Sequence, residues 1–149
     1  MQTFNNRISE GLALAATIDP VSQAAGTVTT GWVSMKDAKR LLAVIQTGVL
    51  GASATVDAKL QQATDTSGSN SKDITNKSIT QIVKASGDNK QAVINLADDE
   101  LDIANGFVAV RLSITVGTAA SLIAAALYLG ASYEDASAQN QAAVVQVVA

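Results

Sequence analysis

The chain has 149 residues, of which 48% are hydrophobic, 15% are charged and 3% are aromatic, and its net charge is −3. This length suits one domain, which buries about two thirds of the surface of its unfolded chain. Histidine and cysteine are both absent, so the side chains most used for catalysis and metal binding near neutral pH are missing. We therefore expect no catalytic site, no cofactor and no metal, and we expect function to lie in surfaces and assembly.

The distribution of charge and apolar residues argues against nucleic-acid and membrane partners. Apart from Arg7 and Arg111, every lysine and arginine lies between Lys36 and Lys90, where aspartates are interleaved with them. No basic stripe results, and binding to phosphate backbones needs one. The longest apolar region, residues 107–130, is interrupted by one arginine and several hydroxyl residues, whereas a membrane-spanning helix needs about 20 mainly apolar residues.

The N-terminal third of the chain predicts three strands. Residues 12–18 alternate before Asp19-Pro20, a turn signal expected to end the first strand. This run also imitates a signal peptide, but Glu10 precedes it and a strand explains the pattern as well. Residues 26–35, rich in Thr and Val, form the second predicted strand, in which Gly31 suggests a bulge or a close backbone approach. Residues 41–47 are apolar on both faces, which predicts a central strand covered on both sides.

The middle of the chain predicts a strand, a loop and a hairpin. Residues 54–63 alternate between apolar and polar side chains, which is typical of a half-buried strand. Residues 64–72 contain no apolar side chain and should form a solvated loop. Two further strands, residues 78–84 and 91–96, flank the turn-type cluster at residues 86–89, as in a hairpin. We expect one helical turn at residues 98–104.

The strongest strand signal lies at residues 107–116, which alternate with a period of two. One predicted face holds Val108, Val110, Leu112, Ile114 and Val116, and the other holds Ala109, Arg111, Ser113 and Thr115. A short Gly-Thr connection leads from this strand into residues 121–129. Alanines in that segment favour a helix by propensity, but a short connection after a long strand favours a hairpin partner, so we expect a strand.

About eight strands, with turns at about ten-residue spacing, predict an all-β fold: a two-sheet antiparallel sandwich of jelly-roll type. Residues 1–133 are assigned to this β-sandwich domain and residues 134–149 to an extended C-terminal arm. A β-branched run at a chain end exposes unpaired backbone groups, so we expect the arm to pair with a neighbouring subunit. The alternative is that it closes its own sheet as a further strand. The candidate interface residues of the arm are Val144, Val145, Val147 and Val148.

Three other features carry a possible site. The acidic residues Asp98, Asp99, Glu100 and Asp102 could hold calcium, but their spacing matches no EF-hand loop and a solvated acidic turn is favoured. Trp32 could be a sugar-stacking platform, but a lone tryptophan in a sandwich is more often core. Arg111 points out of an apolar strand, either as a solvated edge residue or as a partnered arginine at a subunit interface. We keep Arg111 as a candidate interface residue.

Several segments of the chain carry a family resemblance. They are Gly31-Trp32-Val33, residues 41–48, residues 56–65, Lys72-Asp73-Ile74, and Val110-Arg111-Leu112 leading to Val116-Gly117. With this order of elements, over roughly residues 25–130, the chain resembles the small β-sandwich virion proteins encoded in the structural gene modules of tailed bacteriophages and prophages.

The resemblance implies a non-enzymatic particle component, either a capsid decoration protein or a head or neck accessory protein. Such a component is present in symmetric copies in the virion and is made in the bacterial host cytoplasm. Its implied partners are further copies of itself as a homo-oligomer and the major capsid or other virion proteins. The residues also favour oligomerisation, because low charge and two-faced apolar strands leave more apolar surface than one sandwich hides. The alternative is a carbohydrate-binding jelly-roll module for host-surface attachment, which requires exposed aromatic side chains on one face.

Overall fold

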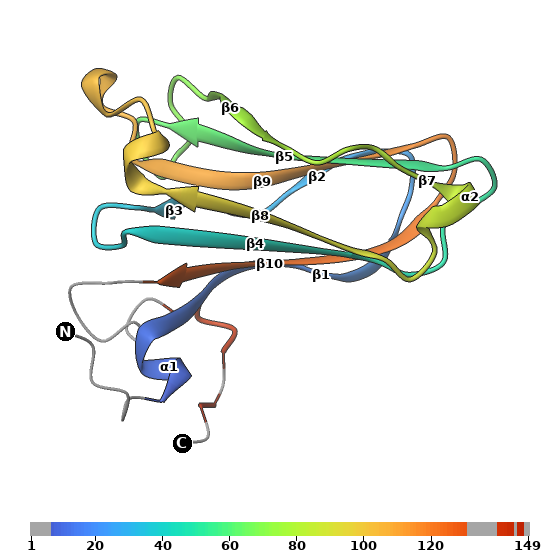
Figure 1. Cartoon of the computed structure of the whole chain (residues 1–149), viewed down its shortest axis with the longest axis horizontal. Helices are drawn as coiled ribbons and strands as arrows, with labels where there is room; N and C mark the ends of the chain where they lie inside the picture. The colour runs from blue at the N-terminus through green and yellow to red at the C-terminus, as the bar shows by residue number, and fades with distance from the viewer. Residues whose placement is uncertain (1–6, 131–139, 145, 148–149) are drawn as a thin grey trace.

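The computed structural model describes residues 7–130, 140–144, 146 and 147, and in this part the chain forms two antiparallel sheets (Figure 1). The strands are β1 (Leu12–Gln23), β2 (Gly26–Thr29), β3 (Val33–Ser34), β4 (Arg40–Thr47), β5 (Thr55–Ala63), β6 (Lys72–Ser78), β7 (Ile82–Val83), β8 (Gln91–Ala97), β9 (Ala109–Gly117) and β10 (Ser121–Gly130). The short helices are α1 (Ile8–Gly11) and α2 (Lys84–Gly87), and two 3-10 turns are η1 (Asp98–Glu100) and η2 (Ile103–Asn105).

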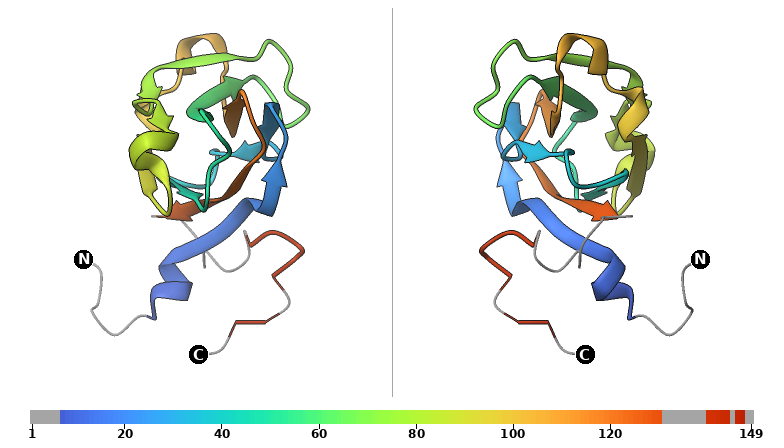
Figure 2. Two further views of the ribbon diagram at one scale, coloured as in Figure 1. Left: turned by 90° about the vertical axis from the view of Figure 1, so that its right-hand side faces the viewer. Right: turned by 90° about the vertical axis from the view of Figure 1, so that its left-hand side faces the viewer.

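The strand order confirms the predicted jelly-roll sandwich. One sheet has the order β1-β10-β4-β8, and the other has the order β2-β9-β5-β6, with β3 paired to β9 and β7 paired to β5. Six of the nine connections between consecutive described strands therefore pass from one sheet to the other, and β2–β3, β5–β6 and β6–β7 stay within the six-stranded sheet. The β5–β6 connection is a hairpin. This interleaving of two antiparallel sheets is the topology of a jelly roll. The end-on views in Figure 2 show the chain winding around the core in this way.

The core lies between the inner faces of the two sheets and is built from aliphatic side chains. In β9 the predicted inner face is confirmed, because Val110, Leu112 and Ile114 have no exposed surface, whereas Ala109 and Ser113 of the predicted outer face are also buried. From the opposite sheet, Leu41 and Ile45 of β4 contribute to the same apolar cluster. Alternation also correctly predicts β5, in which every second side chain is buried. Strand β10 is confirmed as a strand, although the hairpin argument that predicted it is wrong. Strand β10 forms despite its alanines because it pairs with β1 on one side and β4 on the other.

Three predicted strands have different bounds in the structure. Of the predicted strand at residues 78–84, only Ser78, the last residue of β6, and β7 (Ile82–Val83) are in strands. Strand β1 does not end at Pro20 but continues to Gln23, with a register shift between Ile18 and Val21. A bulge and an edge position accommodate proline, because its missing N–H faces no partner strand. The second predicted strand is split into β2 and β3, which both pair with β9. In the break, the hydroxyl of Thr30 accepts a hydrogen bond from the Leu112 amide at 3.0 Å.

The two predicted hairpins around residues 86–89 and 117–118 are wrong. Strand β7 pairs with β5 and β8 pairs with β4, so the chain changes sheets at α2. The turn is fixed to the β4–β5 connection, because Asp88 accepts a hydrogen bond from the Leu50 amide at 2.9 Å and Thr47 donates one to the Gly87 carbonyl at 2.6 Å. Likewise β9 and β10 lie in different sheets. Strand β6 was missed because only Ile74 among its residues is buried, which leaves no alternation to detect.

The loop and turn predictions for residues 64–72 and 98–104 are confirmed. The loop between β5 and β6 is mostly exposed and is shaped by Asp65, whose carboxylate accepts hydrogen bonds from the Ser67 and Ser69 amides at 2.9 and 3.1 Å. The acidic segment forms the short turns η1 and η2, which connect β8 of one sheet to β9 of the other. These turns and the loop lie at the end of the sandwich that also holds β3 (Figure 1).

Candidate functional site

The most distinctive surface is the outer side of the four-stranded sheet, which is apolar along its length. Its central strand β4 was predicted to be covered on both sides, but Leu42 and Val44 remain partly exposed on this outer side. The pairing register places Val44 between Ala126 of β10 and Val93 of β8. We call this surface the apolar face and define it by the outward side chains Leu12, Leu14, Leu42, Val44, Val93, Leu122, Ala124, Ala126 and Tyr128.

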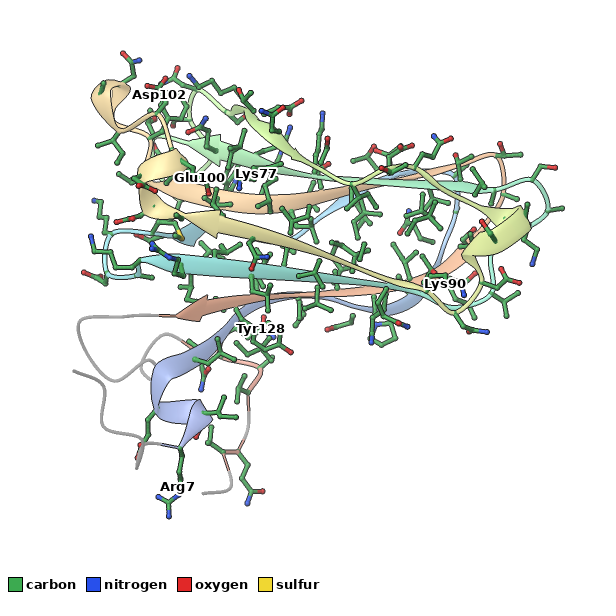
Figure 3. The ribbon with its side chains drawn as sticks, in the orientation of Figure 1. Arg7, Lys77, Lys90, Glu100, Asp102 and Tyr128 are labelled. Atoms are coloured by element: carbon green, nitrogen blue, oxygen red, sulfur yellow. The ribbon has the colours of Figure 1, made fainter. Side chains whose placement is uncertain are left out.

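Large side chains on the apolar face reach well into solvent. Val93 is 54% exposed and Leu122 is 46% exposed. Tyr128 lies on the side of β10 that points away from the six-stranded sheet (Figure 3). Polar residues on this face are mostly uncharged amides, such as Gln46 and Gln91, which lie opposite each other in the register. Continuous apolar patches on the surface of soluble domains are typically interaction sites.

Shallow hollows follow one another along the apolar face. One of about 450 Å³ lies between Pro20, Gln46 and Leu122, and one of about 180 Å³ lies beside it at Ala124. Two more, of about 500 and 680 Å³, lie at the other end of the sheet. Tyr128 lines three of these four hollows. The face is thus corrugated rather than flat, with spaces of the size that side chains of a partner occupy.

The outer side of the six-stranded sheet has the opposite character. Its strands present hydroxyl, amide and charged groups, for example Thr27 and Thr115, whose hydroxyls share a hydrogen bond of 2.8 Å. Lys59 forms an ion pair with Asp73 at 2.7 Å across β5 and β6. Asp57 accepts a hydrogen bond from the Gln81 amide group at 2.8 Å. Only one of the two outer sides therefore leaves a broad apolar surface in water.

The C-terminal segment returns to the edge of its own β1 strand. The Leu14 amide donates to the side-chain carbonyl of Asn140, and the Gln141 amide donates to the Leu14 carbonyl, both at 2.7 Å. Val144 and Val147 line the largest hollow of the apolar face together with Leu14 and Tyr128. Val145 and Val148, which the sequence also placed at an interface, lie outside the described residues, so pairing with a neighbouring subunit stays a prediction.

Arg111 and Trp32 lie together on the outer side of the six-stranded sheet. The guanidinium carbon of Arg111 is 4.6 Å from the centre of the Trp32 ring, which is a cation–π contact. Nε of Arg111 donates a hydrogen bond to the side-chain carbonyl of Gln61 at 2.9 Å. Arg111 is therefore only partly exposed and has partners in its own chain, which differs from a freely solvated edge residue.

The prediction that Trp32 belongs to the core is wrong. Trp32 is partly exposed and lies in the break between β2 and β3, next to the loop after β5. Gly68 of that loop approaches its ring so closely that an added Cβ would come within 2.5 Å of the indole nitrogen. Gly68 also has φ +88°, a conformation that glycine adopts readily. The loop thus covers one part of the tryptophan while the arginine covers another.

The acidic turn after β8 forms ion pairs within its own chain. Lys39 contacts Asp98 at 2.8 Å, Lys77 contacts Glu100 at 2.7 Å, and Lys72 forms an ion pair with Asp102. Figure 3 shows Lys77 and Glu100 side by side at this end of the sandwich. Hydrogen bonds from these lysines lower the pKa of each carboxyl group below its usual value. Among the described residues, no group of three or more acidic side chains is arranged to hold a metal ion.

Sequence reasoning did not identify the apolar face as a unit. The available signal was residues 41–47, whose apolar side chains on both faces exceed what one core needs. Gln61 was also missed. Its contact with Arg111, 50 residues away in sequence, exists only because β5 and β9 are paired in register. In the described residues, no helix is long and apolar enough to cross a membrane.

Comparison with known proteins gives likenesses of low identity. No family model and no curated protein matches the chain. Among solved structures, it is similar to the naturally occurring empty particles of cowpea mosaic virus (10% identity, TM-score 0.43, covering 88% of this chain and 93% of that one). It is also similar to the CBM22-1-GH10 modules of a Clostridium thermocellum xylanase, with 9% identity and a TM-score of 0.44, over 84% of this chain and 27% of that one. A third likeness is to the Gx strain of infectious bursal disease virus, with 10% identity and a TM-score of 0.44, over 84% of this chain and 34% of that one. Viral particles and a xylanase with a carbohydrate-binding module thus both stand among the neighbours, and no function follows from these likenesses.

Proposed function

We propose that this chain is a non-enzymatic structural component of a tailed-phage virion that acts through symmetric contacts between its own copies. The observation that carries the proposal is the apolar face, whose central side chains Leu42, Val44 and Ala126 remain partly exposed in the described part of the chain. A jelly-roll sandwich with one apolar and one polar outer side is suited to a layer in which the polar side meets solvent.

Burial of the apolar face by a second copy is favoured by the hydrophobic effect and is not opposed by charge at the centre of the face. Full burial of one Val or Leu side chain contributes about 1.5–3 kcal/mol relative to its exposure, and Val93 and Leu122 are each about half exposed. The chain carries a net charge of −3, so most surfaces of two copies repel each other weakly. The centre of the apolar face is uncharged, and two copies can approach there without opposing like charges.

The place in the virion, as a capsid decoration protein or a head or neck accessory protein, is proposed from the resemblance to small β-sandwich virion proteins. Symmetric copies bound to the major capsid protein are the assembly that this resemblance implies. The jelly-roll topology is compatible with that assignment, because the fold serves as a building block of viral particles as well as of lectins.

A carbohydrate-binding module for host-surface attachment is the second candidate. The hollows beside Tyr128, with the amide groups of Gln46 and Gln91 nearby on the same face, favour it. Sugar recognition on an open sheet relies on aromatic side chains that share one face. Among the described residues, Tyr128 is the aromatic residue on the apolar face, and Trp32 belongs to the other side of the sandwich. Assembly therefore explains this surface better than sugar binding.

Size-exclusion chromatography with light scattering tests the proposal. We expect the wild-type chain to be an oligomer and V44K to be a folded monomer, because a charge at the centre of the apolar face cannot be buried without a partner. The matched control is T115K, which changes another outward β-branched residue in the polar sheet face, and this variant should remain an oligomer. A wild-type monomer at all concentrations, with glycan binding that is lost in Tyr128→Ala, would support the second candidate instead.

A further inference from the structure

We propose that Arg111 is the docking point for a carboxylate side chain of a protein partner. The site comprises Arg111 of β9, Trp32 before β3 and Gln61 of β5, and it lies on the outer side of the six-stranded sheet. It is therefore on the opposite side of the sandwich from the apolar face. The inference goes beyond the proposed contact between copies and does not depend on it.

The guanidinium group is held in place but is not fully used. Its flat face rests on Trp32 at 4.6 Å and its Nε donates to Gln61 at 2.9 Å, so two constraints fix its plane. Its two terminal nitrogens make no hydrogen bond to any described residue. Four N–H donors of a half-buried cation are thus available to an external acceptor.

Arg111 differs in this respect from the other basic residues that the structure describes. Most of them have a carboxylate within 4.0 Å, and the remaining three, Arg7, Lys36 and Lys90, are exposed. Arg111 alone combines partial burial with the absence of a carboxylate partner in this part of the chain. A partly desolvated guanidinium gains more from an ion pair than a solvated one does, because its water shell is already reduced.

A hydrogen-bonded row of side chains positions the site. Gln61 lies opposite both Arg111 and Asp73 in the strand register, and its amide group donates to Asp73 at 2.9 Å. Asp73 is in turn paired with Lys59 at 2.7 Å. The hydrogen bond from the Gln61 amide group to Asp73 fixes the direction of the Gln61 side chain, so its carbonyl oxygen faces Arg111. Such a row loses little side-chain entropy when a ligand binds, because the groups are already ordered.

The charge and shape of the site favour a carboxylate over other ligands. Two parallel N–H groups of an arginine match the two oxygens of a carboxylate. Lys59 and Asp73 neutralise each other, so the site has one net positive charge, which suits a monoanion better than a phosphate dianion or a nucleic-acid backbone. The contact with Arg111 and the approach of Gly68 already occupy parts of the Trp32 ring, which leaves a poor platform for a sugar. An acidic side chain on a protein partner meets all of these conditions.

The experiment uses Trp32, the one tryptophan in the chain, as a fluorescent reporter beside the proposed site. We expect a glutamate-rich peptide to give a saturable change in its emission and a glutamine-rich peptide of equal length to give none. Arg111→Lys should weaken the peptide about tenfold, because lysine keeps the charge but loses the bidentate fork. The matched control Arg40→Lys, at an exposed arginine elsewhere, should leave the affinity unchanged.

A second variant keeps the test decisive if Arg111→Lys does not fold. Gln61→Glu preserves the shape of the side chain and supplies a carboxylate to Arg111 from within the chain, so it should abolish peptide binding. It also exchanges the hydrogen bond to Asp73 for a contact between two carboxylates, so circular dichroism is used to check that the variant is folded. Unchanged affinity in Arg111→Lys or Gln61→Glu would overturn the proposal. Equal response to the glutamine-rich peptide, or saturation only by inorganic phosphate or by an oligogalacturonate, would overturn it as well.

Discussion

Leu112 and Ser113 are neighbours in β9 whose side chains point to opposite sides of the six-stranded sheet. Leu112 has no exposed surface and belongs to the core cluster, whereas Ser113 faces the outer side, where Lys59 and Thr29 flank it in the register. Leu112→Ala should lower the free energy of unfolding by about 2–5 kcal/mol, and Ser113→Ala should lower it far less. Chemical denaturation measures both losses, and equal losses would contradict the assignment of faces.

Gly68 allows the loop after β5 to pack on Trp32. Gly68→Ala should lower the free energy of unfolding by about 1–3 kcal/mol, because the new Cβ would meet the indole nitrogen at 2.5 Å and the residue has φ +88°. The displaced indole should also shift the emission maximum of Trp32. The control is Gly31→Ala, since an added Cβ meets nothing within 4 Å there. Similar stability losses in the two variants would show that the loop does not pack on the ring.

At the level of single residues, the sequence predicts which side chain is buried only where the strand is regular. In β9 the alternation correctly predicts the buried face from Val110 to Val116, but Ser113 on the opposite face is buried as well. Trp32 lies between the end of β2 and the start of β3, outside any strand, so the alternation of a strand does not determine which way its side chain points. Its partners Arg111 and Gly68 come from segments far along the chain, and no local pattern encodes their approach.

At the level of elements, η1 links the two sheets through ion pairs. Asp98 contacts Lys39 just before β4, and Glu100 contacts Lys77 of β6, so the turn bonds to both sheets. The lysine hydrogen bonds lower the pKa of these carboxyl groups in the folded state below the usual 3.8 for Asp and 4.5 for Glu. Their contribution to stability is therefore present above those values and is lost as the pH falls through the lowered pKa values.

We expect the melting temperature to fall as the pH is lowered from about 5 to about 3, because the unfolded chain takes up protons first. In Lys77→Met the decline should be shallower, because the pKa of Glu100 then moves back toward 4.5. Thermal melts followed by circular dichroism provide the measurement. A melting temperature that stays constant or rises over this pH range would contradict the role of the ion pairs.

The C-terminal segment contributes more to assembly than to folding in this account. Deleting residues 136–149 removes the hydrogen bonds of Asn140 and Gln141 to β1, each of which contributes about 1 kcal/mol. We expect the shortened chain to fold with a slightly lower melting temperature and to associate more weakly, because Val144 and Val147 leave the largest hollow. Sedimentation equilibrium measures the association. Loss of folding at every concentration would show that the segment is part of the domain itself.

Most strands could be predicted from the sequence, but β6 and the strand pairing could not. Alternation marks β5 and β9 because each has one face in the core. The short connection at residues 117–118 has the length of a hairpin, yet it leads to the other sheet, where β10 fits between β1 and β4. That choice depends on the whole jelly roll, in which partners are far apart in sequence, and a local turn signal cannot express it.

At the level of the whole molecule, the two outer sides of the sandwich differ in a way that only the assembled sheet reveals. Composition indicated low charge and excess apolar residues, and residues 41–47 were apolar on both faces. The apolar face exists because β1, β10, β4 and β8 come together in that order, with Leu42 beside Tyr128 and Val44 beside Ala126. Strand order is a property of the fold, so the sequence analysis placed the candidate interface at Arg111 and the C-terminal valines and did not identify the apolar face.

The central claim is that a second copy covers the apolar face, and cysteine labelling tests it most directly. The chain contains no cysteine, so Ala126→Cys on the apolar face and Thr115→Cys on the polar side each introduce one reporter thiol. In the concentrated protein, we predict that a maleimide labels Thr115→Cys at the rate of a free thiol and labels Ala126→Cys far more slowly. Dilution to the monomer should restore fast labelling of Ala126→Cys. Fast labelling of Ala126→Cys at high concentration, equal to that of Thr115→Cys, would contradict the claim.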